Sequence, residues 1–342
     1  MTWYIDQGPD SDVIISSRIR LARDLDHYPF PHRMDSQQAR QAADEITEAF
    51  FNKDKERKRS YLLLELETLS EEDQQALAEK RLISSDLASK GVGRRVIISR
   101  DESVSIMINE EDHIRIQSMQ AGLNLEAAYE AAAAAVLILE GKLSLAYSER
   151  YGFLTACPTN TGTGMRASVM AHLPGLTMSG RIKDVIESLN KMGFAVRGNY
   201  GEHSKAQGHL FQISNQLTLG LTEDDLISDL KRMLLQLIEQ ERKLRREIYR
   251  QQPLLIEDKV MRAYGVLTQA RIMTSEEAVT LLSGIRLGLS LGLLPQVQEA
   301  DLNRIQAAIG PASIQKAQGR LMAPEERDTA RAAIIRDILN KT

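Results

Sequence analysis

Two arginines placed two positions apart are the first sign of chemistry in this sequence. Arg18 and Arg20 lie in a segment, residues 13–23, where apolar and polar residues alternate, which predicts a half-buried strand. Side chains at i and i+2 of a strand project from the same face about 7 Å apart, and each guanidinium is a planar fork that matches phosphate oxygens. We therefore expect Arg18 and Arg20 to bind a phosphate group, although a solvated strand face is the alternative. On the core face of the same strand we expect Val13, Ile15, Ile19 and Leu21.

A run of three carboxylates follows a second short apolar strand. Glu110, Glu111 and Asp112 come directly after the β-rich residues 104–108, and three adjacent carboxylates repel one another unless a cation lies beside them. That cation could be a metal, or a guanidinium or ammonium group of a substrate. An acidic turn in water is the alternative. Arg115, a few residues later, is expected on the polar face of the next strand.

The single cysteine, Cys157, opens a loop rich in glycine and threonine. Gly162, Gly164 and Ala167 imitate the dinucleotide-binding pattern G-x-G-x-x-A, but an alternating strand follows them instead of a helix. A loop that leads into a strand bearing Arg166 is the better interpretation. Cys157 is then either a reactive thiol beside a Pro-Thr-Asn turn or a small buried hydrophobe.

A fourth segment, RGNYGEH at residues 197–203, places an arginine and a carboxylate in a bend between two glycines. Such loops often present functional groups on a rigid scaffold, although a plain hairpin loop is the alternative. Together the four segments supply arginines, separated carboxylates and one thiol. These parts suit phosphoryl transfer to a guanidinium, because arginines neutralise a polyphosphate. The carboxylates can align the guanidinium, whose pKa exceeds about 12, and accept its proton.

The first two-thirds of the chain must position these groups. Its strands and helices do not alternate regularly, so we expect an α+β fold with a mainly antiparallel sheet flanked by helices over residues 11–224. The expected helices are 36–51, 123–140 and 180–191, and the expected strands are 95–99, 104–108, 165–173, 194–197 and 209–215.

The last third of the chain is helical in pattern. We expect residues 225–342 to form an all-helical C-terminal domain. Its first helix begins at Thr222, with acidic residues in the first turn, and ends before Pro253. Two later helices are expected to begin at Asp301 and Pro324.

Composition limits the function classes that remain. The 342 residues are 43% hydrophobic and 26% charged, the balance of an ordinary soluble globular protein. A net charge of −4 disfavours direct nucleic-acid binding. The longest apolar run, residues 131–139, is too short to span a bilayer, and the N-terminus lacks the features of a secretion signal. We therefore expect a cytoplasmic protein with no membrane partner, and one cysteine excludes an internal disulfide.

The four segments, in this order, resemble the catalytic segments of the phosphagen (guanidino) kinase family. They are SSRIR at 16–20, NEEDHIRIQSM at 109–119, CPTNTGTGMRAS at 157–168 and RGNYGEH with QISN at 212–215. The helical C-terminal region and the motif RDTARA at 327–332 are similar to the bacterial protein arginine kinase branch of that family. The resemblance covers essentially the whole chain.

That resemblance implies roles for individual residues, with ATP and Mg²⁺ as cofactors. Glu111 and Glu202 would grip and deprotonate the guanidinium, and Cys157 would lie beside it. Arg81 falls where the family carries a histidine against the nucleotide. The implied nucleotide site is Ser16, Ser17, Arg18, Ile19, Arg20, Arg81, Arg115, Arg166, Ala167, Ser168, Val169, Met170, Arg197, Gly198, Asn199, Tyr200, Gly201 and Glu202. No residue would ligate a metal directly, since Mg²⁺ arrives with ATP, and Glu110 and Asp112 would lie in its outer coordination sphere.

The resemblance also implies an activity, partners and a regulatory site. Arg327, Asp328, Arg331 and Ala332 would bind phosphoarginine in an allosteric pocket; from the residues alone, a helix face with an Arg–Asp–Arg salt pattern is the alternative. The activity would be ATP-dependent phosphorylation of arginine residues in proteins during the stress response. The implied partners are protein substrates with exposed arginines, including a CtsR-type repressor, a McsA-type activator, a Clp ATPase and protease, and further copies of this chain in a homodimer or larger assembly. A kinase of a free small guanidino compound and a non-enzymatic phosphoarginine-binding adaptor are the alternatives.

Overall fold

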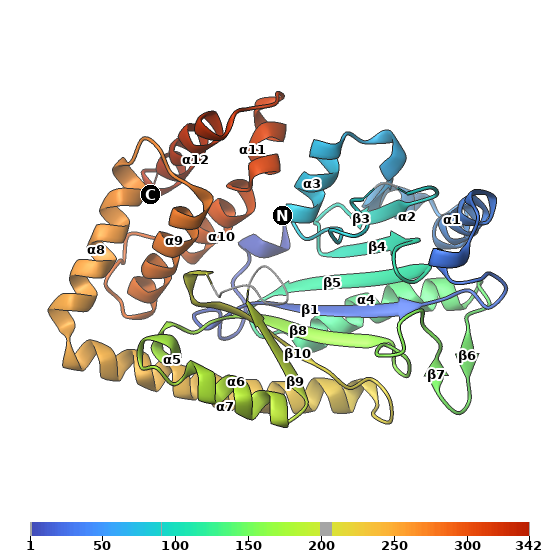
Figure 1. Ribbon diagram of the computed structural model, residues 1–342, viewed down its shortest axis with the longest axis horizontal. Coiled ribbons are helices and arrows are strands. Elements are labelled where there is room, and N and C mark those ends of the chain that lie inside the picture. The colour runs from blue at the N-terminus through green and yellow to red at the C-terminus, as the bar shows by residue number, and fades with distance from the viewer. Residues whose placement is uncertain (1, 90, 199–206, 342) are drawn as a thin grey trace.

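An eight-stranded sheet forms the centre of the protein (Figure 1). The computed structural model describes residues 2–89, 91–198 and 207–341. The strand order is β2-β3-β4-β5-β1-β8-β10-β9, and each of these pairings is antiparallel. Its strands are β1 (Ile14–Arg23), β2 (Tyr61–Glu65), β3 (Arg95–Ser99), β4 (Val104–Ile108), β5 (Ile114–Ala121), β8 (Met165–His172), β9 (Phe194–Gly198) and β10 (Leu210–Asn215), and β6 (Tyr147–Ser148) and β7 (Gly152–Phe153) form a separate pair. The expected α+β fold with an antiparallel sheet is confirmed.

Helices flank the sheet and make up the last third of the chain. The α-helices are α1 (Ser36–Phe51), α2 (Lys55–Ser60), α3 (Glu71–Glu79), α4 (Leu125–Glu140), α5 (Pro174–Met178), α6 (Ile182–Lys191), α7 (Glu223–Gln251), α8 (Pro253–Gln269), α9 (Ser275–Ser290), α10 (Glu299–Ala308), α11 (Pro311–Gln318) and α12 (Pro324–Leu339). Four short 3₁₀ turns accompany them: η1 (Trp3–Ile5), η2 (Pro31–Arg33), η3 (Leu66–Thr68) and η4 (Gln207–His209).

One face of the sheet is covered by α1, α4, α6 and α7, whose apolar side chains join those of the strands in one core. The alanines of α4, such as Ala128 and Ala132, are fully buried, because small side chains let a helix lie close to a sheet. Polar side chains of β1, β5 and β8 must therefore project from the opposite face. That face is the one on which the expected arginines lie.

Strand β1 departs from the simple alternation that its sequence predicts. Its pairing with β8 shifts between Ile14 and Ser16, which is the position of a bulge. As a result Ile14 lies in the main core, whereas Ile15 contacts a small cluster on the other side of the sheet. The expected core position of Ile15 is wrong. The bulge adds one residue to the strand, so the side chains before it point to the opposite faces from those that simple alternation predicts. Ile19 and Leu21 lie beyond the bulge and are buried as expected.

The C-terminal region is all-helical, as expected, and has its own core. Helix α7 instead packs against the sheet, with Leu230 and Leu234 fully buried in the main core. Pro253 ends α7 and also opens α8, since proline is tolerated in a first helical turn. The helix expected at Asp301 begins two residues earlier, at Glu299, and α11 was not expected. A division into two domains at residue 225 stays a prediction.

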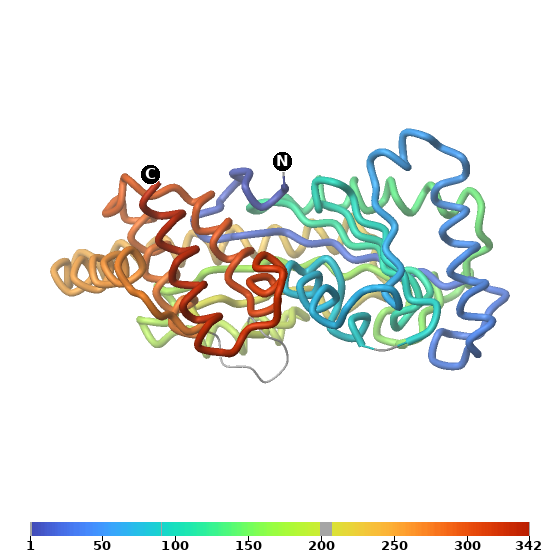
Figure 2. Tube along the Cα trace, turned by 90° about the horizontal axis from the view of Figure 1, so that it is seen from above, coloured from blue at the N-terminus to red at the C-terminus, as the bar shows by residue number. Residues whose placement is uncertain are grey.

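The C-terminal helices lie at one end of the molecule, and part of them reaches back over the sheet. Figures 1 and 2 show α11 beside α3, which precedes the strand β3. The N-terminal turn η1 lies between the sheet and α10. In the described part of the chain, every helix is too short or too polar to cross a membrane.

Candidate active site

Four arginines lie together on the face of the sheet that points away from the main core. Strand β1 supplies Arg18 and Arg20, β5 supplies Arg115, and Arg166 of β8 is the register partner of Arg20. Arg18, Arg20 and Arg115 line a cavity of about 530 Å³, which we call the arginine cavity. Its walls come from the α3 end and from α9 to α11. The predicted sharing of one strand face by Arg18 and Arg20 is confirmed by this arrangement.

The crowding of these guanidinium groups is electrostatically costly without an anion. Burial and the guanidinium groups of Arg81, Arg115 and Arg166 lower the pKa of Arg18 to about 9. Burial and the neighbouring arginines also bring the pKa of Arg20 well below its ordinary value. A polyphosphate would offset this repulsion, because its oxygens accept charge-assisted hydrogen bonds from guanidinium forks. The arginine cavity therefore has the chemistry of a polyphosphate site.

Hydroxyl groups orient two of the arginines. Arg18 Nε donates to Ser168 Oγ at 3.3 Å. Arg166 donates to Ser214 Oγ from Nε at 3.3 Å and from Nη2 at 3.2 Å. Arg197 of β9 stands opposite Gln212 of β10, whose side chain lines the arginine cavity. The QISN segment thus takes part in the site by supporting the arginines from the neighbouring strand.

Glu110 joins the arginine cavity to a second one. Its carboxylate accepts hydrogen bonds from Arg115 Nη1 and Ser84 Oγ, two residues that line the arginine cavity. Burial acts to raise the pKa of Glu110, but Arg115 and Ser84 outweigh it and hold that pKa below its ordinary value. Glu110 is also one of the residues that line the second cavity. An ionised Glu110 therefore fixes Arg115 at the boundary between the two spaces.

The second cavity, also of about 530 Å³, contains the exposed Glu111, and we call it the Glu111 cavity. It is bordered by η2, the first turn of α1 and the turn between β4 and β5. Asn160 Nδ2 lies 3.5 Å from Glu111 Oε2. Cys157, three residues before Asn160, is half-buried with Sγ 3.0 Å from Thr159 Oγ1. The structure therefore brings the NEED turn and the CPTN loop together.

Asp112 connects the NEED turn to the CPTN loop on the side that faces the protein interior. It is buried, and its Oδ1 accepts a hydrogen bond from Ala156 N at 2.7 Å. Burial and the nearby carboxylate of Asp24 raise the pKa of Asp112 to about 8. Asp24 in turn accepts from His113 N at 2.9 Å and lies 2.6 Å from His113 Nδ1. Asp112 thus faces the protein interior and ties the Glu111 turn to the Cys157 loop.

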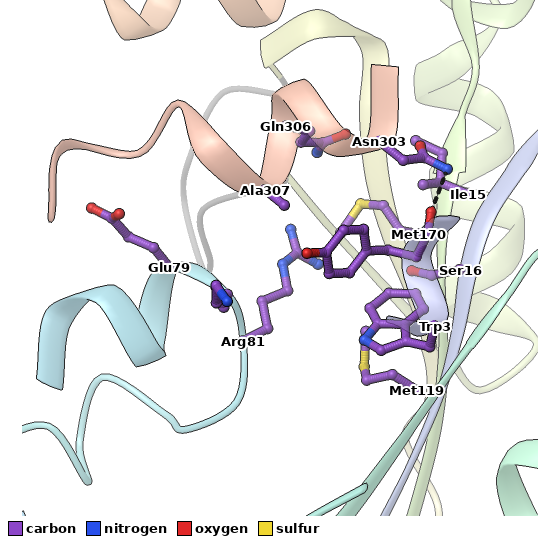
Figure 3. A pocket seen from close by; sticks show the side chains of 12 residues that line it. Trp3, Ile15, Ser16, Glu79, Arg81, Met119, Met170, Asn303, Gln306 and Ala307 are labelled. Atoms are coloured by element: carbon purple, nitrogen blue, oxygen red, sulfur yellow. Dashed lines mark hydrogen bonds between the residues drawn. The ribbon is translucent and has the colours of Figure 1, made fainter. Parts of the chain in front are cut away.

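An apolar pocket adjoins the arginine cavity (Figure 3). Arg81 reaches into it from the turn after α3, and Ser16, Met119 and Met170 of the sheet form one wall. Five further lining residues belong to segments that sequence reasoning missed. They are Trp3 and Tyr4 of η1 and Asn303, Gln306 and Ala307 of α10.

A hydrogen bond connects the two missed segments, since Asn303 Nδ2 donates to Tyr4 O at 2.9 Å. The one signal for η1 in the sequence is that Trp3 is its only tryptophan. No local pattern marks Asn303 or Gln306, because both lie on an ordinary amphipathic helix.

Several residues of the expected nucleotide site lie away from these cavities. The side chains of Ile19, Ala167 and Val169 are in the main core on the opposite face. Ser17 Oγ donates to Gly122 O at 2.8 Å and accepts from Asn124 N at 2.9 Å, so it fastens the end of β5. Gly198 ends β9, and Asn199, Tyr200, Gly201 and Glu202 lie outside the described residues. Their predicted roles stay predictions.

The RDTARA motif lies on α12, far from Glu111 in the chain and on the opposite side of α11 from α3. Arg331 and Ala332 are each only 1% exposed, whereas Arg327 and Asp328 are half-buried. Arg331 donates to Ile309 O at 2.9 Å and to Met273 O at 2.8 Å, and it pairs with Asp328. Arg331 is therefore a buried structural residue that holds Asp328, whereas Arg327 and Asp328 are more accessible.

Metal-ligating side chains do not gather within the described residues, where no three of His, Cys, Asp or Glu could hold an ion together. Both oxygens of Glu110 are engaged, and Asp112 points inward. The donor set therefore fits an ion that is carried by a polyphosphate better than one held by the protein alone.

Comparisons with known proteins agree with this geometry. Residues 41–244 match the family model of the ATP:guanido phosphotransferase C-terminal catalytic domain, and residues 253–342 match that of the protein-arginine kinase McsB C-terminal domain. The protein-arginine kinase of Halothermothrix orenii is 42% identical over 338 residues, which are 99% of this chain and 96% of that protein. The chain belongs to the protein-arginine kinase family.

Other relatives agree with this membership. The protein-arginine kinase of Geobacillus stearothermophilus is 43% identical over 98% of this chain and 93% of its own. Among solved structures, the duplicated taurocyamine kinase of Schistosoma mansoni with bound transition-state analogue components has a TM-score of 0.59 and 31% identity. That similarity covers 67% of this chain, which spans about 33% of the taurocyamine kinase chain. The predicted resemblance to guanidino kinases is confirmed.

Proposed function

We propose that this protein transfers the γ-phosphoryl group of ATP to arginine side chains of proteins. The observation that supports this most directly is the pair of adjoining cavities, one lined by arginines and one containing an exposed carboxylate, with ionised Glu110 between them. The first suits a polyphosphate and the second a cationic acceptor. Membership of the protein-arginine kinase family supports the same reaction.

The arginine cavity binds the nucleotide in this proposal. Arg18, Arg20, Arg115 and Arg166 donate to the phosphate oxygens and stabilise the charge that spreads over the transferred group. Mg²⁺ that arrives with ATP adds to this neutralisation of charge. The purine lies in the apolar pocket, where the Arg81 guanidinium can stack on its face. The buried side chains of Met119 and Met170 exclude water on the other side.

The Glu111 cavity binds the acceptor. Glu111 accepts hydrogen bonds from the guanidinium, aligns one nitrogen with the γ-phosphorus and takes the proton that this nitrogen releases. A nitrogen–phosphorus bond forms as the bond from the γ-phosphorus to the bridging oxygen breaks, and ADP leaves. Glu202 is the second carboxylate and Cys157 the thiol beside the guanidinium in this proposal.

The product tests this function. A protein substrate incubated with the enzyme and Mg·ATP at neutral pH is expected to gain phosphoarginine, detected by mass spectrometry and lost after brief acid treatment. A label that survives acid as phosphoserine does would exclude the proposal. Consumption of ATP with free arginine but with no protein substrate would favour a kinase of small guanidino compounds.

The wider setting is also a proposal. We infer a cytoplasmic enzyme that acts on exposed arginines, with a CtsR-type repressor among its substrates, a McsA-type activator, a Clp ATPase and protease downstream, and a homodimer as its assembly. The phosphoarginine pocket at Arg327, Asp328, Arg331 and Ala332 would recruit or regulate it. Co-purification with each partner and light scattering of the isolated protein test these statements.

A further inference from the structure

Glu79, the last residue of α3, is hydrogen-bonded to the first turn of α11. Its Oε1 accepts from Ala312 N at 2.8 Å, and its Oε2 accepts from Ser313 N at 2.8 Å and Ser313 Oγ at 2.7 Å. The two partners are more than two hundred residues apart in the chain. One carboxylate thus satisfies donors that the start of a helix would otherwise leave without partners.

The contact is close and has a second attachment. A Cβ at Gly310 would lie 2.1 Å from Glu79 Oε2, so any larger residue there would force the carboxylate away. Farther along the two helices, Lys316 Nζ lies 2.8 Å from Asp73 Oδ1. Figure 2 shows the two helices side by side. The end of α3 and the start of α11 therefore form a defined junction, which we call the α3–α11 junction.

This junction forms part of the walls of the arginine cavity and of the apolar pocket. Glu79 lines the arginine cavity and the apolar pocket, and Ile309, Gly310 and Pro311 line the arginine cavity opposite the sheet. On the α3 side, Arg81 follows Glu79 by two residues. Figure 3 shows Glu79 turned toward the helical region while Arg81 turns into the pocket.

Two features act against the position of Arg81, which is held by its backbone bond from Gln117 and by the end of α3. Its φ of 61° is in the left-handed region, which non-glycine residues adopt only when their surroundings impose it. Its guanidinium is close enough to Arg18 to depress the pKa of that group, so like charges push it away from the cavity. The apolar side chains of helix α3 lie in a small cluster beside the sheet, separate from the main core. The bonds from Glu79 to α11 oppose this repulsion by fixing the end of α3.

We propose that Glu79 is a positioning residue for nucleotide binding: through the α3–α11 junction it holds Arg81 and the segment Ile309–Pro311 in place around the nucleotide. This rests on the proposed function, because it takes ATP as the ligand of the two cavities. Glu79 does not touch the reacting atoms. Its removal should therefore weaken nucleotide binding and leave the chemical step at saturating ATP nearly unchanged.

The test compares Glu79→Gln with the wild type and with Glu72→Gln, a control on the same helix outside the junction. We expect Glu79→Gln to raise the dissociation constant for Mg·ADP in calorimetry, and KM for ATP, by about fivefold or more, the lower range of typical coupling between sites. The turnover number should stay within about twofold, and Glu72→Gln should match the wild type. Equal nucleotide affinity in wild type and Glu79→Gln would overturn the proposal.

A double-mutant cycle separates positioning from a general loss of structure. If Glu79 acts by holding Arg81, then Glu79→Gln should add little to the affinity lost in Arg81→Gln, because the effects of coupled residues are non-additive. Full additivity would show that Glu79 does not act through Arg81. If the wild type itself binds no Mg·ADP, the proposed function fails instead, so the two failures are distinguishable.

Discussion

At the scale of single residues, the structure gives two neighbouring carboxylates opposite tasks. Glu110 is 7% exposed and paired with Arg115, whereas Glu111 is exposed in the adjoining cavity. The turn that carries both carboxylates is fixed by Asn109, which has a φ of 57° and donates from Nδ2 to Ala39 O at 2.7 Å and to Gly93 O at 2.9 Å. The sequence predicts that these carboxylates need a cation. It does not predict that the cation beside Glu110 is Arg115 of the same chain.

Replacement of Glu111 by Gln should lower turnover by at least ~10²-fold, the usual contribution of a general base. The amide keeps the shape of the side chain but cannot accept the proton of the guanidinium. Affinity for Mg·ADP should change little, because the proposed phosphate site is the other cavity. Steady-state phosphorylation assays and calorimetry check both expectations. Glu149→Gln, in the exposed turn between β6 and β7, is the control, and near-normal turnover in Glu111→Gln would remove Glu111 from the chemistry.

The raised pKa of Asp112 makes stability depend on pH. Its pKa is about 8 in the folded protein and 3.8 ordinarily, owing to burial and Asp24. The folded state therefore binds a proton that the unfolded state has already released, so this stabilisation is complete below pH 4 and is lost as the pH rises to 8. Asp112→Asn carries no such proton.

The unfolding temperature of the wild type relative to Asp112→Asn should consequently fall between pH 4 and pH 8 and become constant above that. Thermal unfolding by circular dichroism at several pH values measures this difference. The variant Asp184→Asn, on an exposed part of α6, should run parallel to the wild type. A constant difference between wild type and Asp112→Asn at all pH values would contradict the assignment.

At the scale of elements, local patterns predicted most strands and helices and failed where one residue changed the register. Helix α1 and strands β3 and β4 have the predicted bounds. The bulge before Ser16 could not be predicted, because it depends on how β8 pairs with β1. Helix α11 is only 8 residues long, and its start is stabilised by Glu79 from a distant helix and not by a residue of its own.

The strand β1 gives a prediction of its own. Arg18→Lys or Arg20→Lys keeps the positive charge but replaces a planar fork of donors by a point charge. The variant therefore still attracts a phosphate but cannot donate two parallel hydrogen bonds to it. We expect KM for ATP to rise about tenfold for either variant, which corresponds to one charge-assisted hydrogen bond. Arg40→Lys, on the exposed side of α1, is the matched control. Unchanged KM in both β1 variants would show that the strand does not bind the nucleotide.

At the scale of the whole molecule, the site is assembled from segments whose meeting no local pattern reveals. The four motifs predicted the arginines and Glu111, because residue type and spacing express their chemistry directly. Trp3, Asn303 and Glu79 enter only through the way that η1, α10 and α3 pack together. The C-terminal helices therefore line the arginine cavity and the apolar pocket as well as carrying RDTARA.

The two arginines of RDTARA differ in accessibility, and this changes what each should do. Arg331 is buried and bonded to the carbonyls of Met273 and Ile309, while Arg327 and Asp328 are half-exposed. A phosphate from solvent can therefore reach Arg327 directly, and Asp328 can accept from the guanidinium that bears it. Arg331 orients Asp328 through their ion pair. Truncating Arg331 would leave buried carbonyls without donors, which costs about 1–3 kcal/mol each.

Arg327→Ala should thus weaken binding of free phosphoarginine at least about tenfold with an unchanged unfolding temperature, the scale of one charged hydrogen bond. Asp328→Asn should weaken binding similarly but also lower the unfolding temperature, because it removes the ion-pair partner of the buried Arg331. Arg331→Ala should weaken binding and also lower the unfolding temperature. Calorimetry with phosphoarginine and thermal unfolding measure the two effects, with Thr329→Ala on the exposed side of α12 as control. Because Ile309 links Arg331 to the wall of the arginine cavity, the Arg331 variant should in addition bind Mg·ADP more weakly than Arg327→Ala does. Unchanged phosphoarginine binding in all three variants would leave RDTARA as a salt-bridged helix that only supports the fold.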